Sequence, residues 1–364
     1  MKTIKFVSND LHQKKFTTAL RKNVNDYFKE NKISKKGNLA MYMQSIIMLA
    51  FYLIPFVIIL TMSINNWVAL LMVVLMGVGL AGIGMSVMHD AVHGSYSNKQ
   101  WVNTFYGASM YLLGSNVLNW EIQHNLLHHS YTNVDGYDQD IASKGPIRLC
   151  EHAPLHKIHK YQYIHAFFFY GLMTIVKLTK DFTQLLYFYK VKLVKSSLNI
   201  MYEFLKMVFV KIMYLVIFIG LPIILTPFSW WQVIFGFFIM HWLAGCILST
   251  VFQMAHVVEG TKQPLPNKDG IIHTTWMVHQ LNTTSDFARD NLFLNWYVGG
   301  LNFQIEHHLF PNICHVHYRK IAPIIEKTAI NFGYNYNLKP SFLAALKSHI
   351  KRLKELGQAS DTKL

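Results

Sequence analysis

The chain has 364 residues, of which 52% are hydrophobic and only 15% are charged, and its mean hydropathy is +0.22. This composition is too apolar for an ordinary soluble domain and indicates an integral membrane protein, for which the charge-free blocks described below lead us to expect an all-α fold. The formal net charge is +15, but the basic residues follow no nucleic-acid-binding motif. We therefore expect no nucleic acid partner, and we expect the charge to attract membrane lipids, an acidic redox partner or a phosphate-bearing substrate.

The first 36 residues form a basic segment with ten Lys or Arg, and they lack the apolar stretch of a signal peptide. Within this segment, residues 11–32 have the spacing of a charged surface helix. Residues 37–89 then contain no Asp, Glu, Lys or Arg, and their length suffices for two spans of about 20 residues. We expect these spans at about 39–62 and 67–88, with a turn at 63–66.

A second charge-free block covers residues 212–258 and is interrupted at 226–229 by Thr-Pro-Phe-Ser, a sequence that ends a helix. It predicts two further spans, at about 208–226 and 230–254. All 34 Lys and Arg lie outside the two blocks, and basic residues near spans tend to stay in the cytoplasm. The pattern predicts two hairpins, with the N-terminus, the segment between the hairpins and the C-terminus all cytoplasmic.

The chain shows no repeat and no flexible linker, so we expect one membrane domain at 37–330, followed by a charged helical tail at 331–364. Two apolar stretches, 104–118 and 165–176, are too short to span a bilayer. We expect them to form helices that wall a lipid-accessible cavity. The three cysteines are widely spaced, which indicates neither a disulfide framework nor a cysteine metal site.

Three histidine clusters are the most informative feature of the chain. They read HDAVH, HNLLHH and QIEHHLFP, and their histidines are His89, His93, His124, His128, His129, His307 and His308. Imidazole is a strong ligand for transition metals, and spacings of three or four residues place rings on one helix face. On an α-helix His129 would be rotated by about 100° from His124 and His128, so the second cluster could serve two metals. With the predicted topology, all three clusters are cytoplasmic.

Two more residues are expected near the metal. Gln304 stands where a third imidazole would complete the last cluster, and its amide could bind metal weakly, orient a water or hydrogen-bond a ligand. His256 lies at the cytoplasmic end of the fourth span, at the predicted depth of His89 and His93, and we expect it to be an eighth ligand. His241 lies mid-span and is expected to be a packing or channel residue.

Acidic residues beside the clusters are candidates to orient the ligands, because a carboxylate that accepts the other ring N–H fixes the tautomer of a ligating histidine. The alternative for each is a solvated charge or a helix cap. These residues are Asp90, Glu121, Asp138, Asp140 and Glu306.

Seven or eight imidazoles exceed the needs of a closed zinc site and suit two metal ions of higher coordination number. We expect two iron ions that activate O2 for attack on an unactivated C–H bond of a lipid. A hydrolase is the weaker alternative, because it needs only a Lewis acid and a water and would leave many ligands superfluous.

The three clusters, their order and their placement relative to two hairpins resemble those of the membrane fatty acid desaturases, over about residues 37–330. Gln304 followed by IEHHLFP resembles the front-end branch, the delta-6, delta-5 and linoleoyl-CoA desaturase-like enzymes. The resemblance implies a cytoplasmic di-iron cap held by the seven cluster histidines and His256. It also implies that O2 and two electrons insert a cis double bond near the carboxyl end of a (poly)unsaturated acyl-CoA or acyl-lipid.

The sequence departs from this family in two places. No haem-binding HPGG motif of a fused cytochrome b5 domain occurs, so we expect a separate electron donor, a ferredoxin or a cytochrome b5, on the basic face. Phe252 stands where delta-9 acyl-CoA desaturases carry an asparagine, so the shell of the second metal is expected to differ. A di-iron lipid hydroxylase would use the same clusters and remains the alternative function, whereas a transporter is disfavoured because the spans contain few polar residues.

Overall fold

The computed structural model describes residues 3–142, 145–195 and 199–358, and these residues are mostly helical. The last six residues of the predicted tail, 359–364, and the first two of the basic segment lie outside the described residues. The chain divides into two compact units. We call Met1–Gly37, Gln123–Ala166 and Val251–Leu364 the histidine unit, and Asn38–Ile122 with Phe167–Thr250 the span unit.

The span unit is built from helices only, as far as it is described. Its α-helices are α2 (Leu39–Thr61), α3 (Asn66–Gly82), α4 (Met88–Val92), α5 (Gln100–Gly107), α6 (Val117–Trp120), α8 (Met173–Lys190), α9 (Ile200–Leu215) and α10 (Leu221–Leu225). Two π-helical segments, η1 (Ile83–Val87) and η5 (Val216–Gly220), and one 3₁₀ helix, η2 (Ala108–Leu113), join them.

The histidine unit contains helices of very different lengths and, among its described residues, four two-residue strands. Its helices are α1 (Leu11–Glu30), η4 (Lys157–Tyr161), α12 (Trp276–Thr283), α13 (Leu292–Tyr297), α14 (Gln304–Leu309), η6 (His315–His317), α15 (Tyr318–Asn331) and α16 (Phe342–Gln358). The strands form two parallel pairs, β1 (Lys5–Phe6) with β2 (Ile271–Ile272) and β3 (Asp286–Phe287) with β4 (Leu338–Lys339). Three helices, η3 (Glu121–His128), α7 (Gln162–Gly171) and α11 (Trp230–His256), each begin in one unit and end in the other.

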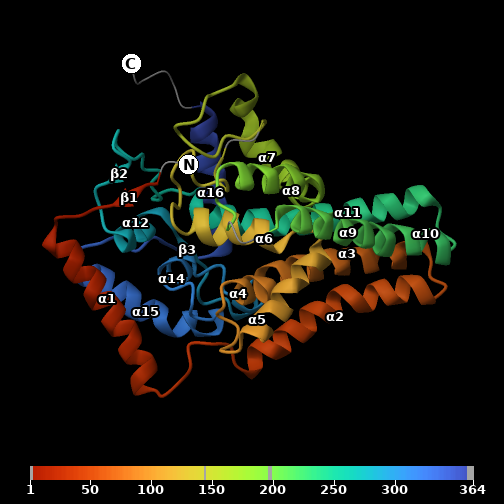
Figure 1. Cartoon of the computed structure of the whole chain (residues 1–364), viewed down its shortest axis with the longest axis horizontal. Helices are drawn as coiled ribbons and strands as arrows, with labels where there is room; N and C mark the ends of the chain where they lie inside the picture. The colour runs from red at the N-terminus through yellow and green to blue at the C-terminus, as the bar shows by residue number, and fades with distance from the viewer. Residues whose placement is uncertain (1–2, 143–144, 196–198, 359–364) are drawn as a thin grey trace. The chain divides into compact units, whose positions relative to one another are not determined.

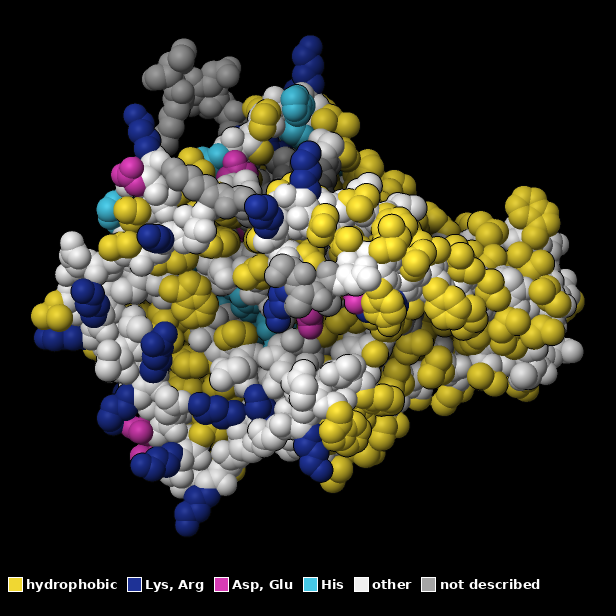
Figure 2. All heavy atoms as spheres, viewed as in Figure 1, with side chains coloured by type: hydrophobic (Ala, Val, Ile, Leu, Met, Phe, Trp, Pro, Cys, Tyr) yellow, Lys and Arg dark blue, Asp and Glu magenta, His cyan; other side chains and the backbone are white. Residues whose placement is uncertain are grey.

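Four helices among the described residues are long and apolar enough to cross a membrane, which confirms the predicted number. They are Leu39–Thr61, Asn66–Val92, Ile200–Leu225 and Trp230–His256. Figure 1 shows the corresponding ribbons α2, α3, α9 and α11, and Figure 2 shows hydrophobic side chains covering this part of the chain. Leu39, Trp67 and Ile224 are each at least 75% exposed, as expected of side chains that face lipid rather than water.

The third of these helices begins at Ile200, earlier than the predicted start near residue 208. The prediction stopped short of two charged residues, Glu203 and Lys206, but these two pair with each other, with Lys206 Nζ 2.6 Å from Glu203 Oε2. Lys211, inside the predicted span, is buried, and its Nζ donates to Asp181 Oδ2 at 3.0 Å and to the Gly114 carbonyl at 2.8 Å. A paired charge can therefore lie inside an apolar helix, because its hydrogen bonds offset part of the cost of desolvation.

Helices α2 and α3 lie against each other in the span unit (Figure 1). Their contact depends on Gly79, because a Cβ at this position would lie 2.7 Å from the backbone of Phe51 and Tyr52. Small residues allow helix backbones to approach closely in membranes, where close packing replaces the hydrophobic effect as a source of stability. The glycine thus sets the spacing of these two helices.

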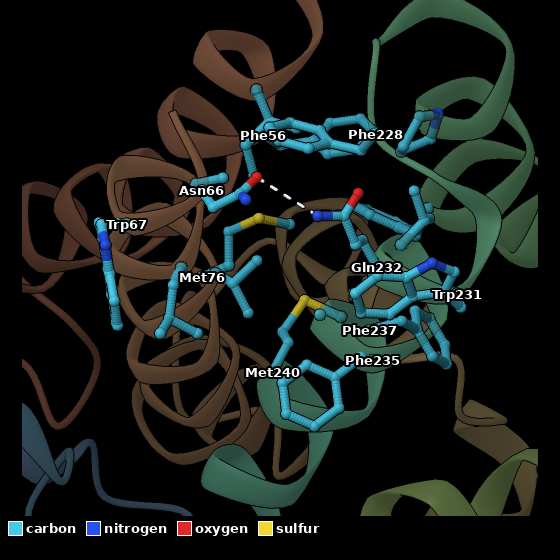
Figure 3. A pocket seen from close by; sticks show the side chains of 18 residues that line it. Phe56, Asn66, Trp67, Met76, Phe228, Trp231, Gln232, Phe235, Phe237 and Met240 are labelled. Atoms are coloured by element: carbon cyan, nitrogen blue, oxygen red, sulfur yellow. Dashed lines mark hydrogen bonds between the residues drawn. The ribbon is translucent and has the colours of Figure 1, made fainter. Parts of the chain in front are cut away.

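Figure 3 shows an apolar cavity of about 380 Å³ inside the span unit, lined by side chains such as Phe56, Phe237 and Met240. Across it, Gln232 Nε2 donates a hydrogen bond to Asn66 Oδ1 at 3.3 Å (dashed in Figure 3). None of the described residues that line it is a His, Cys, Asp or Glu. The cavity therefore suits an apolar group and supplies no metal ligand.

The core of the histidine unit begins with the amphipathic helix α1. Its side chains Phe16, Leu20, Val24 and Phe28 recur every four residues and are buried. They join the apolar residues of α12, α14 and α15 in one cluster. The opposite face of α1 carries exposed Lys and Arg, so the N-terminal segment acts as a charged cover over the apolar residues that flank the third histidine cluster.

Candidate metal centre

The second histidine cluster lies on a π-helix, not on the α-helix that we expected. In η3 the backbone N–H of His129 donates to the carbonyl of His124 at 3.0 Å, an i to i+5 bond that widens the turn. The wider turn brings His129 to His124, and their Nε2 atoms lie 3.3 Å apart. His128 stacks on His124 with ring centroids 5.2 Å apart. The expected α-helical geometry is therefore wrong for this turn, and His129 lies beside His124 instead of being rotated away from it.

The third cluster lies on the short helix α14, where Gln304, His307 and His308 are all at most 1% exposed. Asp286 of β3 holds the beginning of this helix, because its Oδ1 accepts the backbone N–H of Ile305 at 3.0 Å. A carboxylate at a helix N-terminus satisfies a backbone donor that would otherwise be buried unpaired. The sequence therefore fixes the helix that carries two candidate ligands.

His256 ends α11 and is fully buried. Its ring centroid lies 4.7 Å from that of His128 and 4.9 Å from that of His308. Neither ring nitrogen of His256 makes a hydrogen bond of good geometry within the described part of the chain, although the backbone of Thr283 and the side chain of Gln304 lie beside the ring. The Phe252 ring packs at 4.7 Å from His256, where it contributes an apolar wall instead of a polar group.

Within the histidine unit these side chains form groups whose ligand atoms all lie within 4.8 Å of one another. One group is His128, His256 and His308; a second is His129, His307 and His308; a third is His124, His128 and Asp140. His308 belongs to two groups and His128 to two, so the groups are contiguous. The unit therefore contains side chains that could hold more than one metal ion.

His89 and His93 belong to the span unit. His89 lies in α4 and His93 caps that helix, and their ring centroids are 4.8 Å apart. Both rings pack edge-on against Trp120, at 5.6 and 5.8 Å. The predicted pairing of these two rings on one helix face is present.

Asp138 orients His128, as expected for an acid beside a ligand. Its Oδ2 lies 2.9 Å from His128 Nδ1 and also accepts the backbone N–H of Asn133 at 2.9 Å. Burial raises the pKa of Asp138, but His128 and the backbone donors outweigh burial and lower it overall. Burial lowers the pKa of His128, yet Asp138 and then Asp140 raise it above its ordinary value. The carboxylate thus accepts Nδ1–H, which leaves Nε2 of His128 as the nitrogen that could bind a metal.

The other acidic candidates differ from that pattern. Asp140 accepts from Gln123 Nε2, and its Oδ2 lies 3.8 Å from His128 Nδ1. Glu306 is buried and accepts from Tyr336 OH at 2.7 Å, so it supports the fold behind α14. Glu121 is exposed, in agreement with the solvated-charge alternative.

Asp90 is buried beside His89, with 3.8 Å between its Oδ1 and the Nδ1 of that ring. This distance is an ion-pair contact and is longer than a hydrogen bond. Asp138, by contrast, makes a hydrogen bond to a cluster histidine.

Sequence reasoning missed three polar partners of the cluster histidines because they carry no charge. Tyr318 OH lies 3.2 Å from His307 Nδ1. Gln280 Oε1 and Thr132 Oγ1 lie 2.9 and 3.1 Å from His308 Nδ1. Amides and hydroxyls recur throughout the sequence, and no spacing distinguishes these three from the rest.

Gln304 and His241 illustrate opposite outcomes for buried polar groups. Gln304 is 1% exposed, and its Oε1 accepts no hydrogen bond within the described residues. His241 in α11 has partners for both ring nitrogens, Tyr214 OH at 2.8 Å and Thr174 Oγ1 at 3.1 Å. His241 is therefore held as a packing residue of the span unit, one of the two roles we expected for it.

The histidine groups fit a metal on the chemistry of their donors. Both ring nitrogens of the buried His256 lack a hydrogen bond of good geometry in the described structure. The buried His128 has its Nδ1 proton on Asp138, so its Nε2 presents a lone pair. Buried polar atoms are rarely left unsatisfied, so such nitrogens indicate a cation.

Comparison with known proteins agrees with these features. A family model for fatty acid desaturase matches residues 65–340. The chain is 32% identical over 348 residues to a sn-1 linoleoyl-lipid 6-desaturase of Arthrospira platensis, with 96% of this chain and 94% of the relative covered. It is also 32% identical over 353 residues to a sn-1 linoleoyl-lipid 6-desaturase of Synechocystis sp., with 95% and 96% covered.

An acyl-lipid (8-3)-desaturase of Physcomitrium patens is 34% identical over 356 residues, with 96% of this chain and 73% of the relative covered. Relatives of this kind confirm the resemblance to front-end desaturases that Gln304 and the following residues indicated. The chain belongs to the fatty acid desaturase family, a family of oxidoreductases.

Proposed function

We propose that this protein is an acyl-lipid desaturase, which uses O2 and two electrons to insert a cis double bond near the carboxyl end of an unsaturated acyl chain. The observation that carries the proposal is the set of contiguous buried histidine groups in a chain of this family. The sequence left acyl-CoA and acyl-lipid substrates open. The names of the relatives, linoleoyl-lipid and acyl-lipid desaturases, favour a lipid-linked acyl chain.

We propose two iron ions as the metals. The ligands we propose are His89, His93, His124, His128, His129, His256, His307 and His308. The absence of cysteine from the histidine groups and the number of imidazoles favour iron over a closed zinc site. Bound iron would supply the activation of O2 that removal of hydrogen from an unactivated C–H bond requires. The residues around the site would bury the metals and hold each ring in one orientation.

We propose that the side chain of Gln304 lies beside the metal. Its buried Oε1, which has no donor in the described structure, would accept a hydrogen bond from a metal-bound water or a neighbouring ligand, or bind the metal weakly. The orphaned oxygen supports this proposal, because a purely space-filling side chain at this position would be apolar.

For topology we propose two hairpins, with both termini and the metal site in the cytoplasm. The four apolar helices and the absence of Lys and Arg from the two charge-free blocks support this arrangement. The proposed domain limits stay at 37–330 for the desaturase domain and 331–364 for the tail, with the basic segment at 1–36. A separate ferredoxin or cytochrome b5 would deliver electrons to the basic surface of the histidine unit.

The test is product analysis with defined substrates. Membranes that contain the protein, a reduced electron donor and O2 should convert linoleoyl phospholipid or glycolipid into a product with one more double bond, detected by gas chromatography. Conversion of linoleoyl-CoA alone would contradict the lipid-linked substrate. A hydroxylated chain without a new double bond would instead support the alternative, a lipid hydroxylase, which the named relatives favour less.

A further inference from the structure

We propose that Gln280 is a positioning residue of the metal centre, which fixes the tautomer of His308 and directs the Nε2 lone pair of that ring toward the metal. This inference rests on the proposed function, since it requires metal at the histidine groups. Gln280 lies in α12 and is fully buried, so water cannot replace its contacts.

The orientation of the Gln280 amide follows from its partners. Its Nε2 lies 2.9 Å from the backbone carbonyl of His129, and a carbonyl oxygen can only accept. The NH2 group must therefore face His129. Trp276, one helical turn earlier in α12, donates its Nε1–H to the same carbonyl at 3.2 Å. Helix α12 thus holds the backbone of the second cluster with two donors.

The same argument then settles the tautomer of His308. With its NH2 group facing His129, Gln280 turns Oε1 toward His308 Nδ1 at 2.9 Å. An amide oxygen only accepts, so Nδ1 of His308 must carry the proton and Nε2 must carry the lone pair. Thr132 lies beside this pair. Its Oγ1 is 2.8 Å from Gln280 Oε1 and 2.7 Å from the His128 carbonyl, and its single hydroxyl proton can be donated to either oxygen.

The fixed tautomers of His308 and His128 bring two ring nitrogens that carry lone pairs close together. Their Nε2 atoms lie 3.2 Å apart. Asp138 holds the proton of His128 on Nδ1, just as Gln280 holds that of His308. Two ring nitrogens that both present lone pairs at this separation repel each other unless a cation lies between or beside them. Gln280 and Asp138 therefore form a matched pair, one neutral and one anionic, that prepares two imidazoles for metal.

The experiment compares the metal affinity of Gln280→Met with that of the wild-type chain, using purified full-length protein and Fe²⁺ in competition with a chelator. Loss of such a supporting partner should weaken Fe²⁺ binding by about 10- to 100-fold. Gln280→Glu keeps an acceptor for His308 Nδ1–H and should retain more iron than the methionine variant.

Gln162→Met is the matched control. Gln162 is equally buried in the same unit, and its amide bonds the backbone of Arg148 and Leu353 but no cluster histidine. It should lose thermal stability and keep wild-type Fe²⁺ affinity. The proposal is wrong if Gln280→Met binds Fe²⁺ as the wild type does, or if the Gln162 control loses as much affinity.

If Gln280→Met does not yield folded protein, Thr132→Val carries the test. It removes only the hydroxyl beside Gln280 and His308, and should weaken Fe²⁺ binding several-fold; unchanged affinity would overturn the proposal. Because the experiment measures metal affinity, its outcome is independent of the proposed enzymatic activity. A wild-type protein that binds iron but forms no desaturated lipid would contradict the proposed activity and not the role of Gln280.

Discussion

Two sets of buried polar side chains, one around Lys211 and His241 in the span unit and one around His256 and Gln304 in the histidine unit, differ in how the chain satisfies them. In the span unit, Lys211 donates to Asp181 and to backbone carbonyls, and both ring nitrogens of His241 have partners. In the histidine unit, His256 and Gln304 are buried, and neither the ring nitrogens of His256 nor Oε1 of Gln304 make a hydrogen bond of good geometry to a described residue. A completed buried network indicates a role in the fold, whereas an incomplete one indicates a ligand that the protein chain does not supply.

The largest effect should come from the incomplete network. We expect His128→Ala to abolish the desaturated product while leaving membrane-inserted protein detectable, because the ring contributes to two groups of candidate ligands. Gas chromatography of lipids, with immunoblotting of membranes, measures both. Wild-type product from this variant would remove His128 from the metal site and weaken the contrast between the units.

A completed network should behave in the opposite way. Lys211→Met leaves Asp181 buried without its main cation and should lower the free energy of unfolding by about 3–5 kcal/mol. Lys22→Met, in α1, removes the partner of the exposed carboxylate of Asp26 and should cost far less. Thermal unfolding of the purified variants measures the difference. Equal costs would show that the Lys211 pair does not hold the span unit together.

His241→Leu and His256→Leu provide the sharpest contrast within one helix. The first removes the ring partner of Tyr214 OH, while Thr174 Oγ1 keeps its hydrogen bond to the backbone carbonyl of residue 241, and it should cost about 1–3 kcal/mol of stability, with iron content unchanged. The second removes a ring that makes no hydrogen bond of good geometry in the described structure and should lower iron content without that loss of stability. Iron loss from His241→Leu would contradict its assignment as a packing residue.

The smallest effect concerns pH. Burial lowers the pKa of His279 and of His349 to about 4, so the folded protein binds fewer protons than the unfolded chain between about pH 4 and the ordinary histidine value of 6.5. Stability is therefore full above pH 6.5 and falls as the pH is lowered toward 4. Replacing both rings with Gln should flatten this slope in thermal unfolding. An unchanged slope would mean that other groups dominate it.

Much of this arrangement was predictable from the sequence. The two charge-free blocks gave the four apolar helices, and the turns near Ser63 and Pro227 were expected. Histidine spacing identified the residues that the histidine unit gathers. Two features could not be predicted from the sequence. The first is the π-helical turn that brings His129 to His124, because π-helical turns are rare and have no sequence pattern of their own.

The second inaccessible feature is the uncharged support of the rings. Asp138 could be proposed from its position beside a cluster, but Gln280 is 148 residues from Thr132 and meets it only in the folded chain. A neutral amide has no distinguishing pattern, whereas its contacts decide which ring nitrogen of His308 is free. The spacing of the histidines therefore predicted the candidate ligands, whereas the orientation of their rings could be determined only from the structure.

The central claim is that the unsatisfied histidines of this protein hold iron. The most direct measurement is the metal content of the purified wild-type chain by mass spectrometry, with Mössbauer spectroscopy of ⁵⁷Fe-enriched protein. We predict two irons per chain in a nitrogen-rich environment, and a lower content in His256→Leu but not in His241→Leu. Stoichiometric zinc, or iron that is unaffected by His256→Leu, would contradict the account.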